Sequence, residues 1–568
     1  MRLISTSAYL LIITLIVASC AQVVTPNGGK KDVVPPKVVK YVPDSAQLNF
    51  NSKTILIDFN EYIQLKDVNT QLIISPPLEK TPEITSKNKN ILIHFDKNEK
   101  LKPNTTYSIN FGNAIQDITE NNPIENFKYL FSTGDFIDSV TVTGKVKLAF
   151  DHKKEKGIMV MLYSKMNDSS IYKNLPDYFD KTNEDGLFQI ENVKAGNYHI
   201  VALKDINANY KYDSEEELIG FIEGSIDASK NEKIIIELFQ ELPKKIALKK
   251  YVHNSYGKIS LFFNQGSDSI KIKPLDITIK EDQQLIEFSK NKDTLNYWIK
   301  EYAKDSLKLK VLNGNSIIDT LEIDLIKREK ALKNSRNPLK LNLIESPNGN
   351  QSFDLNSELK LIFNHPIVSA NGTPQLKVDS LAYNNKEKKL DFYSNMQSVL
   401  LNVCCRTTNI DSDNPGLLSP TVESFRQWKE NTNYHLFIPP GTFTDIFGFT
   451  NDTIKIDFKT RELKYYGTLK LNLTLPEKEG KYIVQLMDEK ENVIREKLVS
   501  ATESVSLFYE YLQPSKYKLK IIKDENGNKK WDTGNYLKKQ QAEKVIYNAE
   551  LIQIRSNWDA EVDWKLNK

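Results

Sequence analysis

The sequence has little cysteine: of its 568 residues only Cys20, Cys404 and Cys405 are cysteines. They provide no disulfide framework, because Cys20 lies far from the other two and a bond between sequence neighbours is strained. Cys404 and Cys405 follow the strand-like run "SVLLNV", so we predict that their thiols are buried. A pair that faces a partner, or a lipidation site, is the alternative.

Histidine is also scarce, and the six histidines are scattered singly. No His-Glu-x-x-His or Cys-x-x-Cys spacing is available to hold a catalytic metal. The chain also lacks the Gly-x-Ser-x-Gly nucleophile elbow and the phosphate-binding loop. One His-x-x-Glu, from His152 to Glu155, lies in the lysine-rich stretch "DHKKEK" and is interpreted as a solvated turn. We predict that the protein is not an enzyme; a pair of acids that cleaves sugars is the hydrolase alternative, since carboxylates are abundant.

Neither sign of charge dominates, because 77 Lys and Arg residues stand against 74 Asp and Glu residues. The sequence therefore predicts no nucleic-acid partner. No apolar run after Cys20 is long enough for a transmembrane helix. Short alternating runs such as "KTILIDF", "VTVTGKVKL" and "KIIIELF" are separated by Pro, Asn, Asp and Gly. This pattern predicts an all-β fold of tandem β-sandwich domains.

The first residues are typical of a secretory signal, with Arg2 before the apolar run "AYLLIITLIVAS". The end of that run, "VASC", resembles a bacterial lipobox; an ordinary signal peptide that ends in cysteine is the alternative. The resemblance implies a lipoprotein signal peptide at 1–19 and lipidation of Cys20. Acyl chains then hold the protein at a membrane with about 0.8 kcal/mol per buried methylene. Residues 20–35, rich in Gly, Pro and Lys, form a tether.

The remaining chain repeats itself. Residues 36–134 and 340–462 share a Phe-Asn step, a Thr-x-Tyr step and an Asp-Ile step; Tyr107 and Tyr434 mark the second of these. A second pair, residues 138–240 and 463–568, shares a Tyr seven residues before an Asp, as in "YHIVALKD" and "YKLKIIKD". The simplest interpretation is a duplicated tandem of two different sandwiches. Residues 244–338, between the copies, are predicted to form a β-sandwich of uncertain type.

Residues 36–134 and 340–462 resemble the bacterial Ig-like domain of surface and S-layer-associated proteins. Residues 138–240 and 463–568 are similar to the carboxypeptidase-regulatory-like, or transthyretin-like, sandwich, whose pattern is carried by "NEDGLFQIENVKAGNYHIVAL". The later copy departs from that pattern at "LQPSKY". The whole order resembles Ig-like-domain lipoproteins of the Bacteroidetes outer membrane. These resemblances imply fold and anchoring, and they imply no activity.

Two acidic loops, "DINANYKYDSEE" and "DENGNKKWDTGN", carry oxygen-bearing side chains at positions 1, 3, 5 and 9. Such spacing is typical of a loop that binds a hard cation, so calcium is the one cofactor that we weigh. Turn formation, in which Asn and Asp bond their own backbone, is the alternative and requires no ion. The candidate ligands are Asp205, Asn207, Asn209, Asp213, Asp524, Asn526, Asn528 and Asp532.

An insertion at about 370–430 lengthens the second Ig-like segment. Within it, "PTVESFRQWK" predicts a short helix with Val422, Phe425 and Trp428 on one face. We weigh two roles for this face: contact with a partner, because loops on a rigid scaffold often bind, and cover for a sheet edge.

These features predict a non-catalytic lipoprotein of the outer membrane, held there by acylated Cys20. Ala21 follows this cysteine and takes the place of the Asp that favours inner-membrane retention. The predicted role is a binding or scaffold subunit of an envelope complex for barrel assembly, secretion or uptake. Its partner would be an outer-membrane protein, and strand edges of the terminal domain offer β-augmentation. Glycan binding or adhesion at the cell surface is the alternative, and both faces of the membrane stay open.

Overall fold

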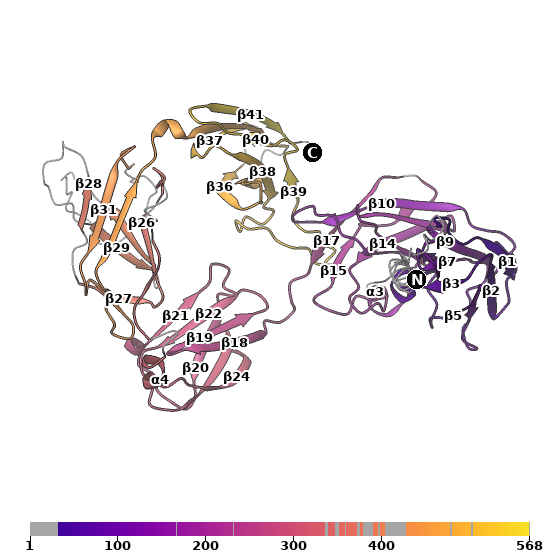
Figure 1. Cartoon of the computed structure of the whole chain (residues 1–568), viewed down its shortest axis with the longest axis horizontal. Helices are drawn as coiled ribbons and strands as arrows, with labels where there is room; N and C mark the ends of the chain where they lie inside the picture. The colour runs from indigo at the N-terminus through magenta and orange to yellow at the C-terminus, as the bar shows by residue number, and fades with distance from the viewer. Residues whose placement is uncertain are drawn as a thin grey trace, which may run out of the picture. The chain divides into compact units, whose positions relative to one another are not determined.

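The computed structural model describes most of the chain from residue 32 to residue 566. Its gaps are residues 166, 168, 231, 335–338, 347–351, 358, 372–374, 379–389, 396–397, 404–427, 477–479 and 501–503. The described chain is all-β, which confirms the predicted fold class (Figure 1). It divides into two compact units, Met1–Leu148 with His152–Leu238 and Ala149–Asp151 with Phe239–Lys568.

The first sandwich begins the first unit and has two main sheets and a small pair of strands. Its sheets are β1 (Val38–Val42)-β2 (Thr54–Phe59)-β6 (Asn90–His94)-β5 (Glu83–Lys87), β4 (Ile73–Ser75)-β7 (Thr106–Gly112)-β9 (Phe127–Ser132) and β3 (Ile63–Leu65)-β8 (Ile115–Asp117). Alternation puts Ile55 and Ile57 of β2 and Ile109 and Phe111 of β7 into one core. That burial fixes the register of the two sheets.

The fourth sandwich, in the second unit, repeats this strand order element by element. Its sheets are β25 (Leu343–Glu345)-β26 (Leu359–Phe363)-β30 (Ser398–Val403)-β29 (Leu390–Asn395), β28 (Gln375–Val378)-β31 (Asn433–Ile438)-β33 (Ile454–Lys459) and β27 (Ile367–Ala370)-β32 (Phe443–Asp445). The repeated tyrosines make the same bond, since the Tyr107 hydroxyl accepts from Lys102 N at 2.8 Å and the Tyr434 hydroxyl from Lys429 N at 3.0 Å. The sequence repeat therefore corresponds to a structural repeat.

The third sandwich has the same order in its two main sheets. They are β18 (Leu248–Ser255)-β19 (Lys258–Phe263)-β22 (Thr294–Ile299)-β21 (Gln284–Phe288) and β20 (Ile270–Pro274)-β23 (Ser306–Asn313)-β24 (Ser316–Asp324). A Phe-Asn step ends its second strand too, and the Asn264 side chain accepts from Ala247 N at 2.9 Å. Asn60 and Asn364 accept equivalent bonds from Lys37 N and Asn342 N. This third Phe-Asn step is the sequence signal that would have identified residues 244–338 as a sandwich of the same type as the first and fourth.

The second and fifth sandwiches share another design. The second runs β12 (Tyr178–Lys181)-β11 (Met159–Tyr163)-β14 (Asn197–Leu203)-β15 (Leu218–Phe221)-β17 (Ile234–Gln240)-β10 (Val140–Leu148)-β13 (Leu187–Val193), with β16 (Ile226–Asp227) beside β14. The fifth has β37 (Ser504–Leu512)-β34 (Gly467–Thr474)-β41 (Asp559–Lys565) and β36 (Val493–Ser500)-β35 (Lys481–Met487)-β38 (Lys516–Lys523)-β39 (Val545–Tyr547), with β40 (Ile552–Gln553) beside β38. In both, the first strand pairs in parallel with a late strand, β10 with β17 and β34 with β41.

The fifth sandwich keeps this design although it departs from the sequence pattern at "LQPSKY". Its Tyr517 hydroxyl donates to Gln513 O at 2.9 Å, as the Tyr198 hydroxyl donates to Lys194 O at 2.9 Å. The tyrosine bond therefore closes the turn in both copies.

Among the described residues, none of the helices has the length and apolar character needed to cross a membrane.

Candidate functional site

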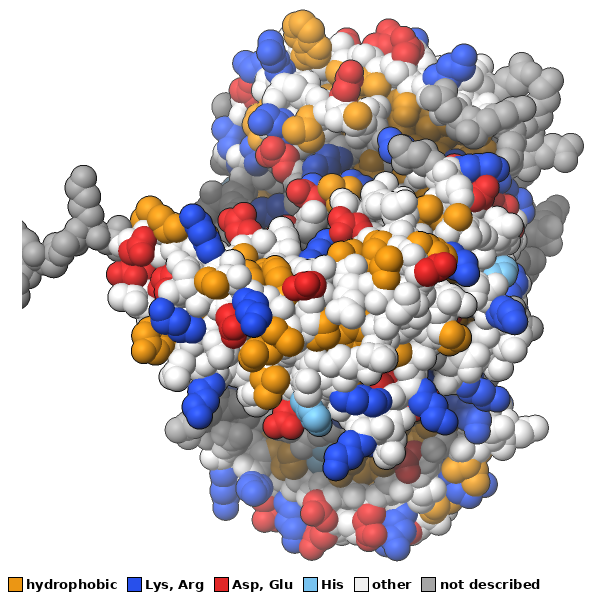
Figure 2. Space-filling model, turned by 90° about the vertical axis from the view of Figure 1, so that its right-hand side faces the viewer, with side chains coloured by type: hydrophobic (Ala, Val, Ile, Leu, Met, Phe, Trp, Pro, Cys, Tyr) orange, Lys and Arg blue, Asp and Glu red, His pale blue; other side chains and the backbone are white. Residues whose placement is uncertain are grey.

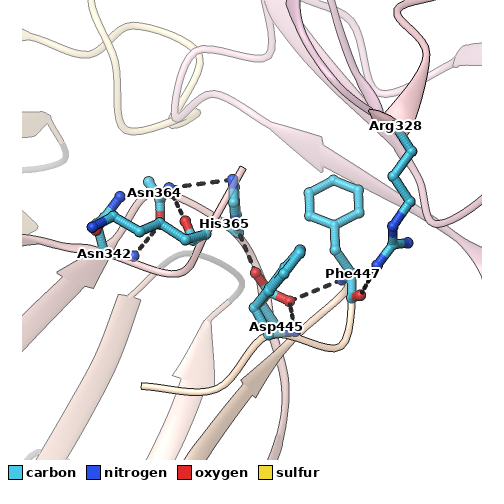
Figure 3. A network of polar contacts seen from close by, with 8 residues as sticks. Arg328, Asn342, Asn364, His365, Asp445 and Phe447 are labelled. Atoms are coloured by element: carbon cyan, nitrogen blue, oxygen red, sulfur yellow. Dashed lines mark hydrogen bonds and ion pairs between the residues drawn. The ribbon is translucent and has the colours of Figure 1, made fainter. Parts of the chain in front are cut away.

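A polar network lies at one end of the fourth sandwich (Figure 3). Ile367 of β27 pairs with Asp445 of β32, which brings the preceding His365 beside the Asp445 carboxylate. His365 Nδ1 lies 2.7 Å from Asp445 Oδ2, and both side chains are buried. Asp445 Oδ1 also accepts from Phe447 N at 3.0 Å and Phe449 N at 2.8 Å. The carboxylate therefore fixes the turn that follows β32.

An apolar cluster covers this network. Its buried members, which we name the junction cluster, are Tyr256, Trp298, Leu339, Ile446 and Phe447. The first two belong to the third sandwich and the last two to the fourth. Arg328 of α4 (Arg328–Leu332) joins the cluster, because Nη2 donates to Phe447 O at 3.1 Å (Figure 3). Its guanidinium also lies 5.8 Å from the Tyr256 ring centroid. The contact between two sandwiches thus has an aromatic centre and a cation at its rim.

Gly257 makes this close packing feasible. Its φ of +69° is in the left-handed region, and a Cβ added there would lie 2.5 Å from the Phe447 ring. Only glycine combines that backbone conformation with so close an approach.

The His365 and Asp445 pair has the geometry of two members of a catalytic triad, yet its third contact differs. In a triad the second imidazole nitrogen faces a nucleophilic hydroxyl or thiol. Here His365 Nε2 lies 3.2 Å from Nδ2 of Asn364, whose own oxygen accepts from Asn342 N (Figure 3). This arrangement orients a loop and supports an inter-sandwich contact.

The first sandwich has different residues at the equivalent positions. Glu61 occupies the place of His365, and Asp117 that of Asp445. Burial alone would raise the pKa of Asp117, but backbone amides led by those of Glu120 and Asn122 bring it below its ordinary value. Burial, followed by the negative charges of Asp117 and Asp32, raises the pKa of Glu61. Two repelling carboxylates thus replace a hydrogen-bonded pair.

The acidic loop of the second sandwich is closed by its own hydrogen bonds. Asp205 Oδ2 accepts from Tyr210 N at 2.6 Å, while the amides of Asn207 and Asn209 donate to Asp213 at 3.1 and 2.6 Å. The fully buried Glu217 accepts from Asp213 N at 3.1 Å and also from Ile206 N. The carboxylate that closes the loop is therefore Glu217, one residue beyond the position of a calcium-loop glutamate.

The loop of the fifth sandwich repeats these contacts. Asp524 accepts from Gly527 N, Asn528 N and Lys529 N, and the amides of Asn526 and Asn528 donate to Asp532 Oδ2 at 2.5 and 2.6 Å. Glu543 takes the place of Glu217 and accepts from Asp532 N at 2.9 Å. Glu543 lies outside the spaced pattern of loop residues, so the sequence did not indicate its role. No cluster of three or more potential metal ligands of the His, Cys, Asp or Glu type is found among the described residues.

Trp428 is the one predicted partner-binding residue that the structure describes. Its indole nitrogen donates to Ser357 O at 2.8 Å, and its ring packs edge-on against Phe353, Tyr434 and Phe458. This placement gives Trp428 a packing role in the fourth sandwich. The other residues of interest, Val422, Phe425, Cys404, Cys405 and Cys20, lie outside the described residues.

The edge strand of the second sandwich, β12, is short and covered. Phe179 N of β12 donates to Ser75 Oγ of β4 in the first sandwich at 3.1 Å. Lys102 and Asp177 add an ion pair of 2.8 Å beside it. The first sandwich therefore protects an edge that would otherwise present unpaired backbone groups.

The equivalent edge strand of the fifth sandwich, β36, is different. It has eight residues, and no strand lies on its outer side in the part of the chain that the structure describes. Val493, Ile494 and Leu498 are 47, 37 and 51 % exposed. Elsewhere apolar side chains are interspersed with charges of both signs, as Figure 2 shows for one face of the molecule. β36 is thus a long edge strand with exposed apolar side chains on both sides of a charged run, residues 495–497.

Comparison with known proteins now identifies one domain type. Residues 32–133 match the family described as bacterial Ig-like domain. The chain contains a bacterial Ig-like domain. It forms the first sandwich, and the third and fourth share its strand order. No curated protein matches the chain.

Several solved structures are similar over long stretches at low identity. The Bacillus anthracis TIE protein is 9 % identical, with 98 % of this chain and 78 % of that chain covered and a TM-score of 0.14. The major pilin subunit BcpA of Bacillus cereus is 10 % identical, with 75 % and 99 % covered and a TM-score of 0.13. The S-layer protein SbsC is 9 % identical, with 86 % and 64 % covered and a TM-score of 0.12. These TM-scores are too low to support any inference about function.

Proposed function

We propose that the protein is a non-catalytic lipoprotein, anchored in the outer membrane through acylated Cys20, that binds an outer-membrane protein as a scaffold subunit of an envelope complex. The complex we propose is a machine for barrel assembly, secretion or uptake. The observation that carries the proposal is the open edge strand β36 with its exposed Val493, Ile494 and Leu498.

An open edge strand can accept an extended segment of a partner as a further strand. Backbone hydrogen bonds along the eight residues of β36 would supply affinity, and the three apolar side chains would supply selectivity. Soluble proteins usually cover or charge such an edge to avoid aggregation. The second sandwich follows that rule at Phe179 and Ser75, whereas β36 has no strand on its outer side in the described chain and keeps exposed apolar side chains on both sides of its charged run 495–497.

The test is affinity isolation of the full-length protein from gently solubilised outer membranes, with mass spectrometry of what co-purifies. We expect a stoichiometric outer-membrane partner, and an about tenfold loss of it in an Ile494→Lys, Leu498→Lys double variant, because charged side chains block edge pairing. Leu187→Lys, at an exposed leucine of β13 in the second sandwich, is the matched control and should keep the partner.

The alternative is glycan binding or adhesion at the cell surface. It is favoured by the aromatic side chains of Phe508 and Trp558 in the fifth sandwich, which are both exposed. Protein that is isolated alone, yet is digested by protease added to whole cells, would contradict the scaffold role and support adhesion.

For the acidic loops we propose a structural role that does not depend on calcium. The donors and acceptors of Asn207, Asn209 and Asp213 already pair with one another, and those of the fifth sandwich do the same. Added calcium should therefore leave the melting temperature unchanged, because only a ligand that binds the folded state raises it. A rise that grows with calcium concentration, and is lost in Asp205→Asn with Asp524→Asn, would contradict this role.

A further inference from the structure

The first sandwich exposes an apolar contact at one end. Tyr62 is 58 % exposed and Ile118 is 52 % exposed. The two lie side by side, because Ile118 N donates to Tyr62 O at 3.2 Å. Around them stand the carboxylates of Asp32, Glu61 and Glu120. We name these five residues the open end of the first sandwich. One cation of the chain itself, Lys89 Nζ, lies 5.6 Å from the Tyr62 ring centroid, so the carboxylates of the open end outnumber it.

The same end of the fourth sandwich is covered. There Ile446 N donates to Pro366 O at 3.0 Å, so Ile446 takes the position of Ile118. Ile446 is only 4 % exposed, because it belongs to the junction cluster with Tyr256 and Trp298 of the third sandwich. The fold therefore uses this end to receive another folded domain.

The charges around the open end indicate which kind of partner surface can bind there. Asp32, Asp117 and Glu120 lie near enough to Glu61 for their charges to act on it in addition to burial. At the fourth sandwich, His365 hydrogen-bonds Asp445, and the cation Arg328 approaches over Tyr256. A surface with excess carboxylates around an apolar centre complements a basic side chain next to an aromatic one.

We propose that the open end of the first sandwich is a docking surface for a folded partner protein that presents a basic side chain beside an aromatic one. This inference rests on the proposed scaffold function and adds to it a contact separate from β36. A second copy of the chain is a poorer fit, since its own loop of this kind, at Tyr256 and Arg328, is buried against Phe447. Residues 21–31 of the same chain are also a poorer fit, because they carry Lys30 and Lys31 but no aromatic residue.

The test places a photo-crosslinking amino acid at Ile118 of the full-length protein in intact outer membranes. The same crosslinker at Leu92, an exposed leucine of β6 in the same sandwich, is the matched control. We expect an adduct from position 118, in about tenfold excess over position 92, to a partner segment whose surroundings in the partner's fold include Lys or Arg beside an aromatic residue.

Charge reversal supplies the second half of the test. Glu61→Lys with Glu120→Lys should lower the yield at position 118 about tenfold, and high salt should lower it as well, because both weaken charge attraction across the contact. Hydrogen exchange of β2 and β8 should be unchanged in this variant, which shows that the sandwich is folded. A yield that survives charge reversal contradicts the proposal.

Three other results would also overturn the inference: an adduct within residues 21–31, an adduct to a second copy, or no adduct. These results leave the scaffold function standing if the partner that depends on Ile494 and Leu498 is still isolated. If that partner is missing as well, the scaffold function itself fails.

Discussion

The first and fourth sandwiches have one strand order and two different ends. In the fourth, the buried pair of His365 and Asp445 supports a turn that enters an aromatic contact with the third sandwich. In the first, Glu61 and Asp117 repel each other, and Ile118 stays exposed. A few side chains on the loops next to β3 and β27 therefore decide whether a sandwich end is covered, while the strands behind them stay the same.

The largest effect is expected when the pair of the fourth sandwich is converted to that of the first. His365→Glu places two carboxylates in a buried site and removes the partner of Asp445, so we expect a loss of about 4 kcal/mol of local stability. Hydrogen exchange of peptides that cover β32 measures it. The reverse change, Glu61→His, acts at a half-buried site and should alter stability by less than about 1 kcal/mol. Equal effects at the two sites would show that the two sandwich ends do not differ in this way.

The aromatic contact is the next test. Phe447→Ala should cost about 3 to 4 kcal/mol, because Phe447 is buried in the junction cluster and its removal leaves a cavity. Thr119→Ala changes the equivalent, exposed position of the first sandwich and should cost less than about 0.5 kcal/mol. Equilibrium denaturation, monitored by hydrogen exchange of peptides that cover β32 and β8, measures the stability loss of each variant. A small loss for Phe447→Ala would show that the cluster adds little to the contact.

A substitution at Gly257 tests whether the third and fourth sandwiches require their close approach at this position. Gly257→Ala should cost about 3 kcal/mol, because it combines left-handed backbone strain with clashes against Ile299 O and the Phe447 ring, each 2.5 Å from an added Cβ. Gly314→Ala is the matched control: its φ is +60° and nothing lies within 4 Å of an added Cβ, so strain alone should cost about 1 kcal/mol. Both are measured by exchange of peptides in the third sandwich. Equal losses would mean that the clash is relieved by a small shift.

The smallest effect concerns pH at the first sandwich. The pKa of Glu61 is raised, so its ionised form destabilises the folded state, and the cost grows as pH rises through the folded pKa. Glu61→Gln should therefore stabilise the first sandwich at neutral pH by about 0.5 kcal/mol or less, and the gain should vanish where Glu61 is protonated in both states. Exchange of β8 peptides at two pH values measures this. A gain that increases as pH falls would have the wrong sign.

Sequence reasoning succeeded where a structural role leaves a local signature. The Thr-x-Tyr step was found twice because each tyrosine bonds a backbone group five residues away, as Tyr107 does with Lys102. The spacing of the acidic loops was visible for the same reason. Glu543 escaped notice because it closes its loop from a position eleven residues beyond Asp532, across a stretch with no repeating pattern.

The sequence by itself determined the all-β class, the repeated order of sandwiches and the turns that close them, because alternation, Phe-Asn steps and tyrosine bonds act over a few residues. Only the tertiary structure decided which ends and edge strands of those sandwiches are exposed. Whether Ile118 or Ile446 is buried, and whether β12 or β36 is an open edge, depends on which distant segment packs against it. Such contacts join residues that are far apart in the chain, and their physical basis is burial and charge pairing, which no local spacing records.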